Sequence, residues 1–117
     1  MTNNKNSTRY YSGRQERKVA KTLDGKQVAN SGAATFVAGD VSSENFLIEC
    51  KTTTTDKKQF TIREDWLIKN EEEAFAMGKP NSALCFDFGP NANKRYYIIS
   101  ERLFQLLNYF LTEDELK

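Results

Sequence analysis

The sequence predicts a single α/β (α+β) domain with one mixed β-sheet flanked by helices. Segments with helical periodicity alternate with short β-prone apolar runs, and 117 residues suffice for one modest core. We expect the element order α-β-β-β-α-β-β-α. We also expect a flexible polar tail over residues 1–11, followed by one domain over residues 12–117.

Capping signals and apolar spacing indicate the second and third helices. The second should run from the capping box Thr61–Glu64 to Met77, because Gly78 is a C-cap signal. Ser100 can cap the third helix. That helix has apolar residues at i, i+3, i+4, i+7 and i+8, namely Leu103, Leu106, Leu107, Phe110 and Leu111.

β-Prone runs bounded by turn residues predict the strands. They cover residues 35–38, 46–52, 82–89 and 95–99. The turn between the last two strands is marked by a Pro-Asn-Ala-Asn sequence at 90–93, which favours a hairpin there.

Composition excludes several classes of chemistry. The chain has no histidine, so His-based triads and His-ligated zinc are ruled out. Its two cysteines, Cys50 and Cys85, fall in predicted buried strands and are expected to be core residues rather than a disulfide. With no signal-peptide pattern and no membrane-spanning segment, we expect a soluble cytoplasmic protein without membrane contact.

Charge is unevenly distributed although its sum is only +1. The first part is basic and the C-terminal end is acidic, which fits a one-sided anion-binding surface. Simple solubility explains the same charges equally well. The basic residues are Lys5, Arg9, Arg14, Arg17, Lys18, Lys21 and Lys26, and the acidic ones Glu113, Asp114 and Glu115.

The candidate chemistry centres on Asp40, Glu49 and Lys51. Asp40 closes one β-like run, and Glu49 and Lys51 lie two residues apart in the next. Because side chains in a strand alternate with a period of two, Glu49 and Lys51 should point the same way. A hairpin over residues 36–52 would bring Asp40 beside them.

A fourth candidate, Glu16, comes from the first predicted helix. This helix should begin at Ser12 and end before Asp24. Glu16 has the spacing i, i+3, i+4, i+7 with Val19, Ala20 and Leu23, so it should lie at the inner edge of an apolar face. The alternative is a solvated glutamate favoured by the helix dipole.

These oxygen donors suit a hard cation such as Mg²⁺, for which Mn²⁺ would substitute. Asp40, Glu49, the backbone carbonyl of Cys50 and, as a possible further ligand, Glu16 could hold it. Lys51 could orient a water or stabilise charge on phosphorus. The set suits phosphodiester hydrolysis without histidine.

The segments Gly39-Asp40-Val41 and Ile48-Glu49-Cys50-Lys51-Thr52 resemble the PD-(D/E)XK nuclease signature, with Glu16 as the extra helical acid. The spacing and small size are similar to archaeal and phage Holliday-junction resolvases. Gly39 replaces the usual proline. The resemblance implies a restriction-endonuclease-like core and catalytic roles for Glu16, Asp40, Glu49 and Lys51.

The resemblance further implies a homodimer that cuts four-way DNA junctions during recombination and repair, and a compact enzyme of this kind would suit a phage. Phosphate contacts are expected from basic and small polar residues. The residues are Arg9, Arg14, Arg17, Lys18, Ser31, Gly32, Thr53, Lys57, Lys58 and Arg63.

Two other functions are compatible with the same residues. One is a nicking or restriction-type nuclease that acts on linear duplex. The other is a non-catalytic nucleic-acid-binding module in which Glu49 and Lys51 form a structural ion pair and Glu16 is solvated.

Overall fold

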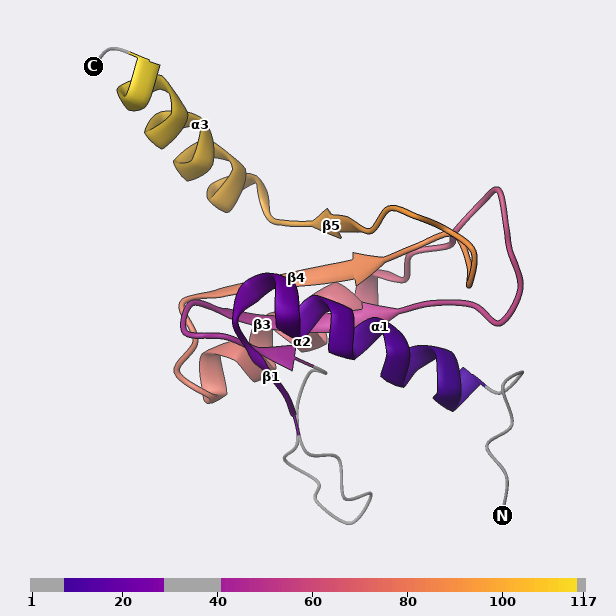
Figure 1. Ribbon diagram of the computed structural model, residues 1–117. Coiled ribbons are helices and arrows are strands. Elements are labelled where there is room, and N and C mark those ends of the chain that lie inside the picture. Colours follow the sequence, from indigo (N-terminus) through magenta and orange to yellow (C-terminus); the bar gives the residue numbers. More distant parts are fainter. Residues whose placement is uncertain (1–7, 29–40, 116–117) are drawn as a thin grey trace.

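The computed structural model describes residues 8–28 and 41–115, and these form a five-stranded sheet with helices around it (Figure 1). The elements follow the predicted order α-β-β-β-α-β-β-α. They are α1 (Thr8–Leu23), β1 (Lys26–Gln27), β2 (Val41–Ser42), β3 (Phe46–Lys51), α2 (Glu64–Ala76), β4 (Asn81–Phe86), β5 (Tyr96–Ile98) and α3 (Glu101–Glu115).

The sheet is mixed, as predicted, and its strands lie in the order β1-β2-β3-β4-β5. Neighbouring strands are antiparallel except for β3 and β4, which run parallel from the pair Phe46–Asn81 to the pair Lys51–Phe86. A parallel pair needs a long crossover connection, and α2 provides it. The C-terminal ends of β3 and β4 therefore meet at one edge of the sheet.

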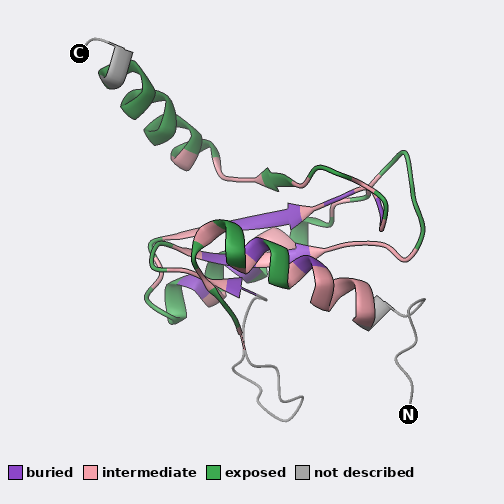
Figure 2. Ribbon diagram, in the orientation of Figure 1, coloured by how far each residue is buried: buried purple, intermediate pink, exposed green. Residues whose placement is uncertain are grey.

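The main core lies between the sheet and α1. Val19 of α1 is fully buried against alternate residues of the strands, including Ile48 and Cys50 of β3 and Cys85 of β4. The buried residues follow the strands through the middle of the molecule in Figure 2. Burying each large aliphatic side chain contributes about 1.5–3 kcal/mol, so this layer fixes α1 on the sheet.

The opposite face of the sheet is covered by α2. Leu47 of β3 is fully buried there with Ala74 of α2. Asn70 is also buried, and its side-chain amide donates to the backbone oxygens of Leu47 at 3.4 Å and Ala83 at 3.0 Å. These bonds tie α2 to both parallel strands.

α3 projects away from the rest of the molecule (Figure 1). Its predicted apolar face is largely exposed, with Phe110 and Leu111 more than half exposed, and Phe104 beside that face is exposed as well. Within the described residues, no helix is long and apolar enough to cross a membrane.

The first helix and the early strands differ from the sequence prediction at their boundaries. α1 begins at Thr8, so Ser12 lies inside the helix instead of capping it. The helix ends as predicted, with Asp24 at φ 52° and the Gly25 amide donating to the Ala20 carbonyl. No predicted strand range covered β1, because its two exposed residues carry no apolar signal. The predicted strand 35–38 lies outside the described residues.

The predicted capping box of α2 does not form. The helix begins at Glu64, and Arg63 occupies the N-cap without a side-chain capping bond. Arg63 instead binds the carboxylate of Asp65 at 3.0 and 3.1 Å. The glycine signal is correct, since Gly78 has φ 73° after the helix, and Ser100 Oγ accepts the Leu103 amide as predicted.

Both cysteines are free and buried, as predicted. Cys50 and Cys85 are register partners in the parallel pair. Burial raises the pKa of the Cys85 thiol from its ordinary 9.0 to about 11. Burial likewise raises the pKa of Tyr97, which lies beside Cys85 on β5, to about 12.

We predict that the free energy of unfolding falls as the pH rises from about 9 toward 11. The folded thiol keeps its proton in this interval while the unfolded chain releases it, so alkali favours unfolding. Urea unfolding at a series of pH values measures the effect. The Cys85→Ala variant should be less stable overall but show a shallower fall, and a flat profile in the parent protein would contradict the prediction.

Candidate active site

Glu49 and Lys51 leave β3 on the face that α2 covers, and they are in contact. Lys51 Nζ lies 3.4 Å from Glu49 Oε2 and 4.4 Å from the centre of the Trp66 ring of α2. Both side chains stay partly open to solvent, 29% for Lys51 and 22% for Glu49. The ring thus holds the ammonium beside a carboxylate where a ligand can reach both.

Asp40 lies outside the described residues, as do Ser31 and Gly32. The described chain resumes at Val41, which pairs with Ile48 across the antiparallel β2–β3 hairpin. Asp40 directly precedes Val41 in the sequence, and Glu49 directly follows Ile48.

Glu16 is not the residue of α1 that points into the core. Its neighbour Gln15 is only 3% exposed and lies one turn before the buried Val19. Glu16 is half-buried and its Oε1 accepts a bond from Gln27 Nε2 of β1 at 3.3 Å. The apolar face of Val19, Ala20 and Leu23 packs on the core as predicted. Gln15, four residues before Val19, lies nearer the centre of that face than Glu16 does.

The described residues supply only part of a metal site. Among residues 8–28 and 41–115, no three His, Cys, Asp or Glu side chains are grouped so that they could hold a metal ion. Glu49 offers a carboxylate, and Cys50 can offer only its backbone carbonyl because its side chain is in the core. These oxygen donors fit Mg²⁺ by type, and Asp40 would be needed for a second carboxylate.

A buried polar network supports the end of β3 from the α1 side. Gln15 Nε2 donates to the Lys51 backbone oxygen at 2.7 Å and to Asp87 Oδ2 at 3.3 Å. Asp87 Oδ1 accepts from Thr52 Oγ1 at 2.6 Å and from the Gly89 amide at 3.1 Å. Sequence reasoning gave Asp87 no role, although an aspartate that ends an apolar strand must find partners when buried.

Two loops meet just beyond the strand ends. The carboxylate of Asp56 accepts from the backbone amide and the side chain of Asn91, at 3.0 and 2.9 Å. These bonds lower the pKa of Asp56. Gly89 has φ 133°, and a Cβ there would lie 2.5 Å from the Asp56 Cα, so the close approach requires glycine.

Some of the predicted DNA-contacting residues are exposed, and others form hydrogen bonds within the protein. Arg14 is half-buried and donates to the Pro90 carbonyl at 2.6 Å, while Arg63 is paired with Asp65, whose pKa it lowers. Thr53 Oγ1 donates to the Thr55 carbonyl. Arg17, Lys18, Lys57 and Lys58 are exposed, and the Arg9 side chain lies outside the described part.

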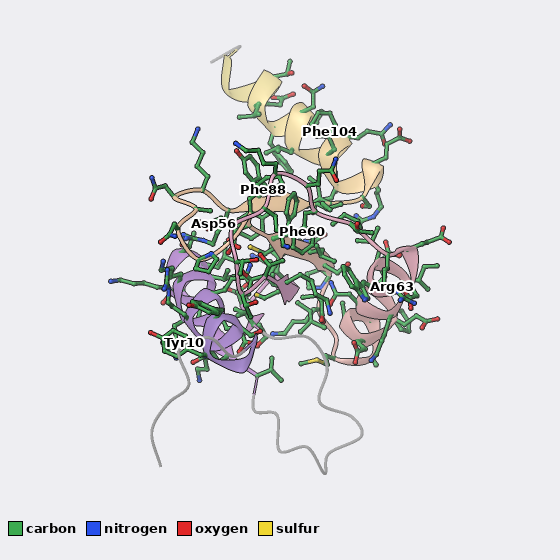
Figure 3. The ribbon with its side chains drawn as sticks, turned by 90° about the vertical axis from the view of Figure 1, so that its right-hand side faces the viewer. Tyr10, Asp56, Phe60, Arg63, Phe88 and Phe104 are labelled. Carbon is green, nitrogen blue, oxygen red and sulfur yellow. The ribbon has the colours of Figure 1, made fainter. Side chains whose placement is uncertain are left out.

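These features gather at one edge of the molecule. In Figure 1, the start of α1, the tips of β3 and β4 and the loops that follow both strands lie on the same side. Figure 3 looks onto that side, with Asp56, Phe60 and Phe88 between Tyr10 of α1 and Arg63 before α2. The edge thus combines cations, the Glu49–Lys51 pair and the buried network.

No known family model and no curated protein matches the chain. Among solved structures, it is similar to the 1.6 Å structure of Archaeoglobus fulgidus Hjc, a Holliday junction resolvase from an archaeal hyperthermophile. The TM-score is 0.54 and the identity 20%, over 74% of this chain and 73% of that one. The restriction-endonuclease-like core that the sequence predicted is therefore the fold of this chain, and it is shared with an archaeal Holliday junction resolvase.

Proposed function

We propose that this protein is a Mg²⁺-dependent, structure-selective DNA endonuclease of the Holliday-junction resolvase kind. The observation that carries the proposal is the contact of Glu49 with Lys51 at an open edge of a fold shared with a resolvase. A carboxylate can hold a metal ion and a neighbouring ammonium can stabilise charge on phosphorus, so this pair suits metal-assisted phosphodiester hydrolysis.

Each residue of the site would have a separate task. Glu49, Asp40 and the Cys50 carbonyl would hold the metal ion, with Mn²⁺ able to replace Mg²⁺. The ion would polarise a phosphoryl oxygen and lower the pKa of a water. Lys51, kept in place by Trp66, would stabilise the charge that develops on the phosphoryl group.

Glu16 would act at a distance from this pair. Its described bond is to Gln27 of β1, the strand that pairs with β2 just after Asp40. From this position, Glu16 would act on the metal ion through a bridging water.

Exposed cations support binding to a nucleic-acid backbone, and we propose branched DNA because the similar structure is that of a Holliday junction resolvase. Lys18 of α1 and Lys57 and Lys58 of the loop after β3 are exposed. Lys18 lines a pocket with Thr52, the residue that follows Lys51. Such cations bind the sugar–phosphate backbone and read its shape rather than its sequence.

A non-catalytic nucleic-acid-binding module is the second candidate. The ion pair of Glu49 with Lys51, and the Trp66 ring over the ammonium, would stabilise such a module without any reaction. Metal titration by calorimetry separates the two proposals. Heat of Mg²⁺ or Mn²⁺ binding that disappears in Asp40→Asn supports the enzyme, and the absence of such binding supports the module.

We predict that Lys51→Ala and Asp40→Asn each lower the cleavage of a four-way junction by about 100-fold or more. The control Lys69→Ala, which removes an exposed lysine of α2, should cleave like the parent protein. The measurement is a gel assay with Mg²⁺ and with Mn²⁺, beside a linear duplex of the same sequence. Thermal unfolding should show that all the variants are folded.

The assay also has outcomes that reject the proposal. A parent protein that leaves junction, flap and duplex uncut with either metal is not this nuclease. Equal cleavage of junction and duplex would instead indicate a nicking or restriction-type enzyme. Full activity in Lys51→Ala would exclude the role given to the ammonium.

We also propose a homodimer, formed through α3. Six apolar residues of this helix are more than 40% exposed: Phe104, Leu106, Leu107, Tyr109, Phe110 and Leu111. Together they expose on the order of 600 Å² of side-chain surface. That approaches the roughly 800 Å² per partner of a standard interface. A groove of about 380 Å³ at the base of α3, lined in part by Ala74, Phe75 and Leu103, extends the same apolar surface.

Sedimentation should detect the dimer and its loss. Phe104→Glu combined with Phe110→Glu places two charges in the proposed interface, so we predict a monomer at concentrations where the parent protein is a dimer. The control Gln105→Glu adds a charge on the other side of the helix and should remain dimeric. A parent protein that is monomeric at high concentration would contradict the prediction.

A further inference from the structure

A small basic pocket opens at the same edge, on the α1 side of the sheet. We define it by Arg14, Gln15, Lys18, Thr52, Asp87 and Arg95. Its volume is about 20 Å³, enough for one or two oxygen atoms. Of these residues, Arg95 lies in the connection between β4 and β5 and has no part in the function proposed above.

Two buried polar atoms of this pocket have no partner. Arg95 Nε is a donor without an acceptor, and Gln15 Oε1 is an acceptor without a donor. Gln15 is only 3% exposed, so its orientation is fixed by the two bonds that its Nε2 makes. An unpaired buried donor costs about 1–3 kcal/mol, which a bound oxygen ligand would recover.

The charge of the pocket favours an anion. Arg14, Lys18 and Arg95 bring three positive charges against the single carboxylate of Asp87. Both Asp87 oxygens already accept bonds, Oδ1 from Thr52 and Gly89 and Oδ2 from Gln15. The carboxylate is thus bonded within the protein. Arg14 donates from Nη2 to the Pro90 carbonyl, whereas Lys18 is exposed and Arg95 Nε has no acceptor, so these two cations can contact a ligand.

The pocket and the catalytic pair lie on opposite sides of β3. Glu49 and Lys51 point toward α2 and Trp66, whereas Gln15 reaches the Lys51 backbone oxygen from α1. Thr52, the residue after Lys51, lines the pocket. A phosphate in the pocket is therefore a different phosphate from the one beside Lys51.

We propose that this pocket binds a second backbone phosphate of the DNA substrate, with a non-bridging oxygen at Arg95 Nε. Arg14 and Lys18 flank the same phosphate, and a water bridges it to Gln15 Oε1. The inference rests on the proposed function for its substrate. It adds Arg95 to the DNA-binding residues and gives the substrate two points of contact across the end of β3.

The test measures the binding of a four-way junction, without divalent metal, as a function of KCl concentration. Arg95→Gln should bind about 10-fold more weakly or worse, because a charged hydrogen bond is lost. The slope of log K against log salt should become shallower by about one. Lys94→Gln, next to Arg95 but outside the pocket, should behave like the parent protein.

A second variant and a second probe keep the test decisive. Lys18 is exposed, so Lys18→Gln should fold normally and give the same shallower slope even if Arg95→Gln proves unstable. Inorganic phosphate should raise the unfolding temperature of the parent protein above that in chloride of equal ionic strength. It should do so less in both pocket variants.

The result can separate this inference from the proposed function. Phosphate stabilisation that is lost in the pocket variants supports the pocket even in a protein that cuts no DNA. Folded pocket variants with unchanged junction affinity, salt slope and phosphate response would overturn it, even if the parent protein cleaves junctions.

Discussion

The parallel pairing of β3 with β4 is the constraint on which the rest of the structure depends. It forces α2 to cross the sheet, and the crossover brings Trp66 over Lys51. It also ends both strands at the same edge, so Thr52 and Asp87, 35 residues apart, form a hydrogen bond. The candidate catalytic pair and the polar network are both consequences of one strand pairing.

Burying the carboxylate of Asp87 at this edge destabilises the fold, and the polar network compensates for it. Asp87 is 8% exposed, and a buried carboxylate destabilises a fold unless donors surround it. Gln15, Thr52 and the Gly89 amide provide those donors from three different segments of the chain. Because Gln15 also holds the Lys51 carbonyl, the bonds that compensate Asp87 fix the backbone that carries the catalytic candidates.

The sequence predicted side-chain positions correctly where they follow from the two-residue alternation along a strand. The alternation of β3 predicted that Glu49 and Lys51 share a face, and these two side chains are in contact. The prediction was less accurate for the polar residue that faces inward from α1, since Gln15 is buried with Val19 while Glu16 is only half-buried. The partners of Asp87 could not be predicted at all, because Gln15 lies 72 residues away in the chain.

In the proposed dimer, the position of α3 would separate the dimer interface from the edge proposed to bind DNA. α3 leaves the sheet through β5 and extends away from the edge where β3 and β4 end (Figure 1). A dimer joined through α3 would therefore leave both copies of that edge open to DNA. Because an isologous dimer relates its two sites by a two-fold axis, their separation would be fixed by the interface. In such a dimer, the apolar helix that is largely exposed in the monomer would set the distance between the two candidate sites.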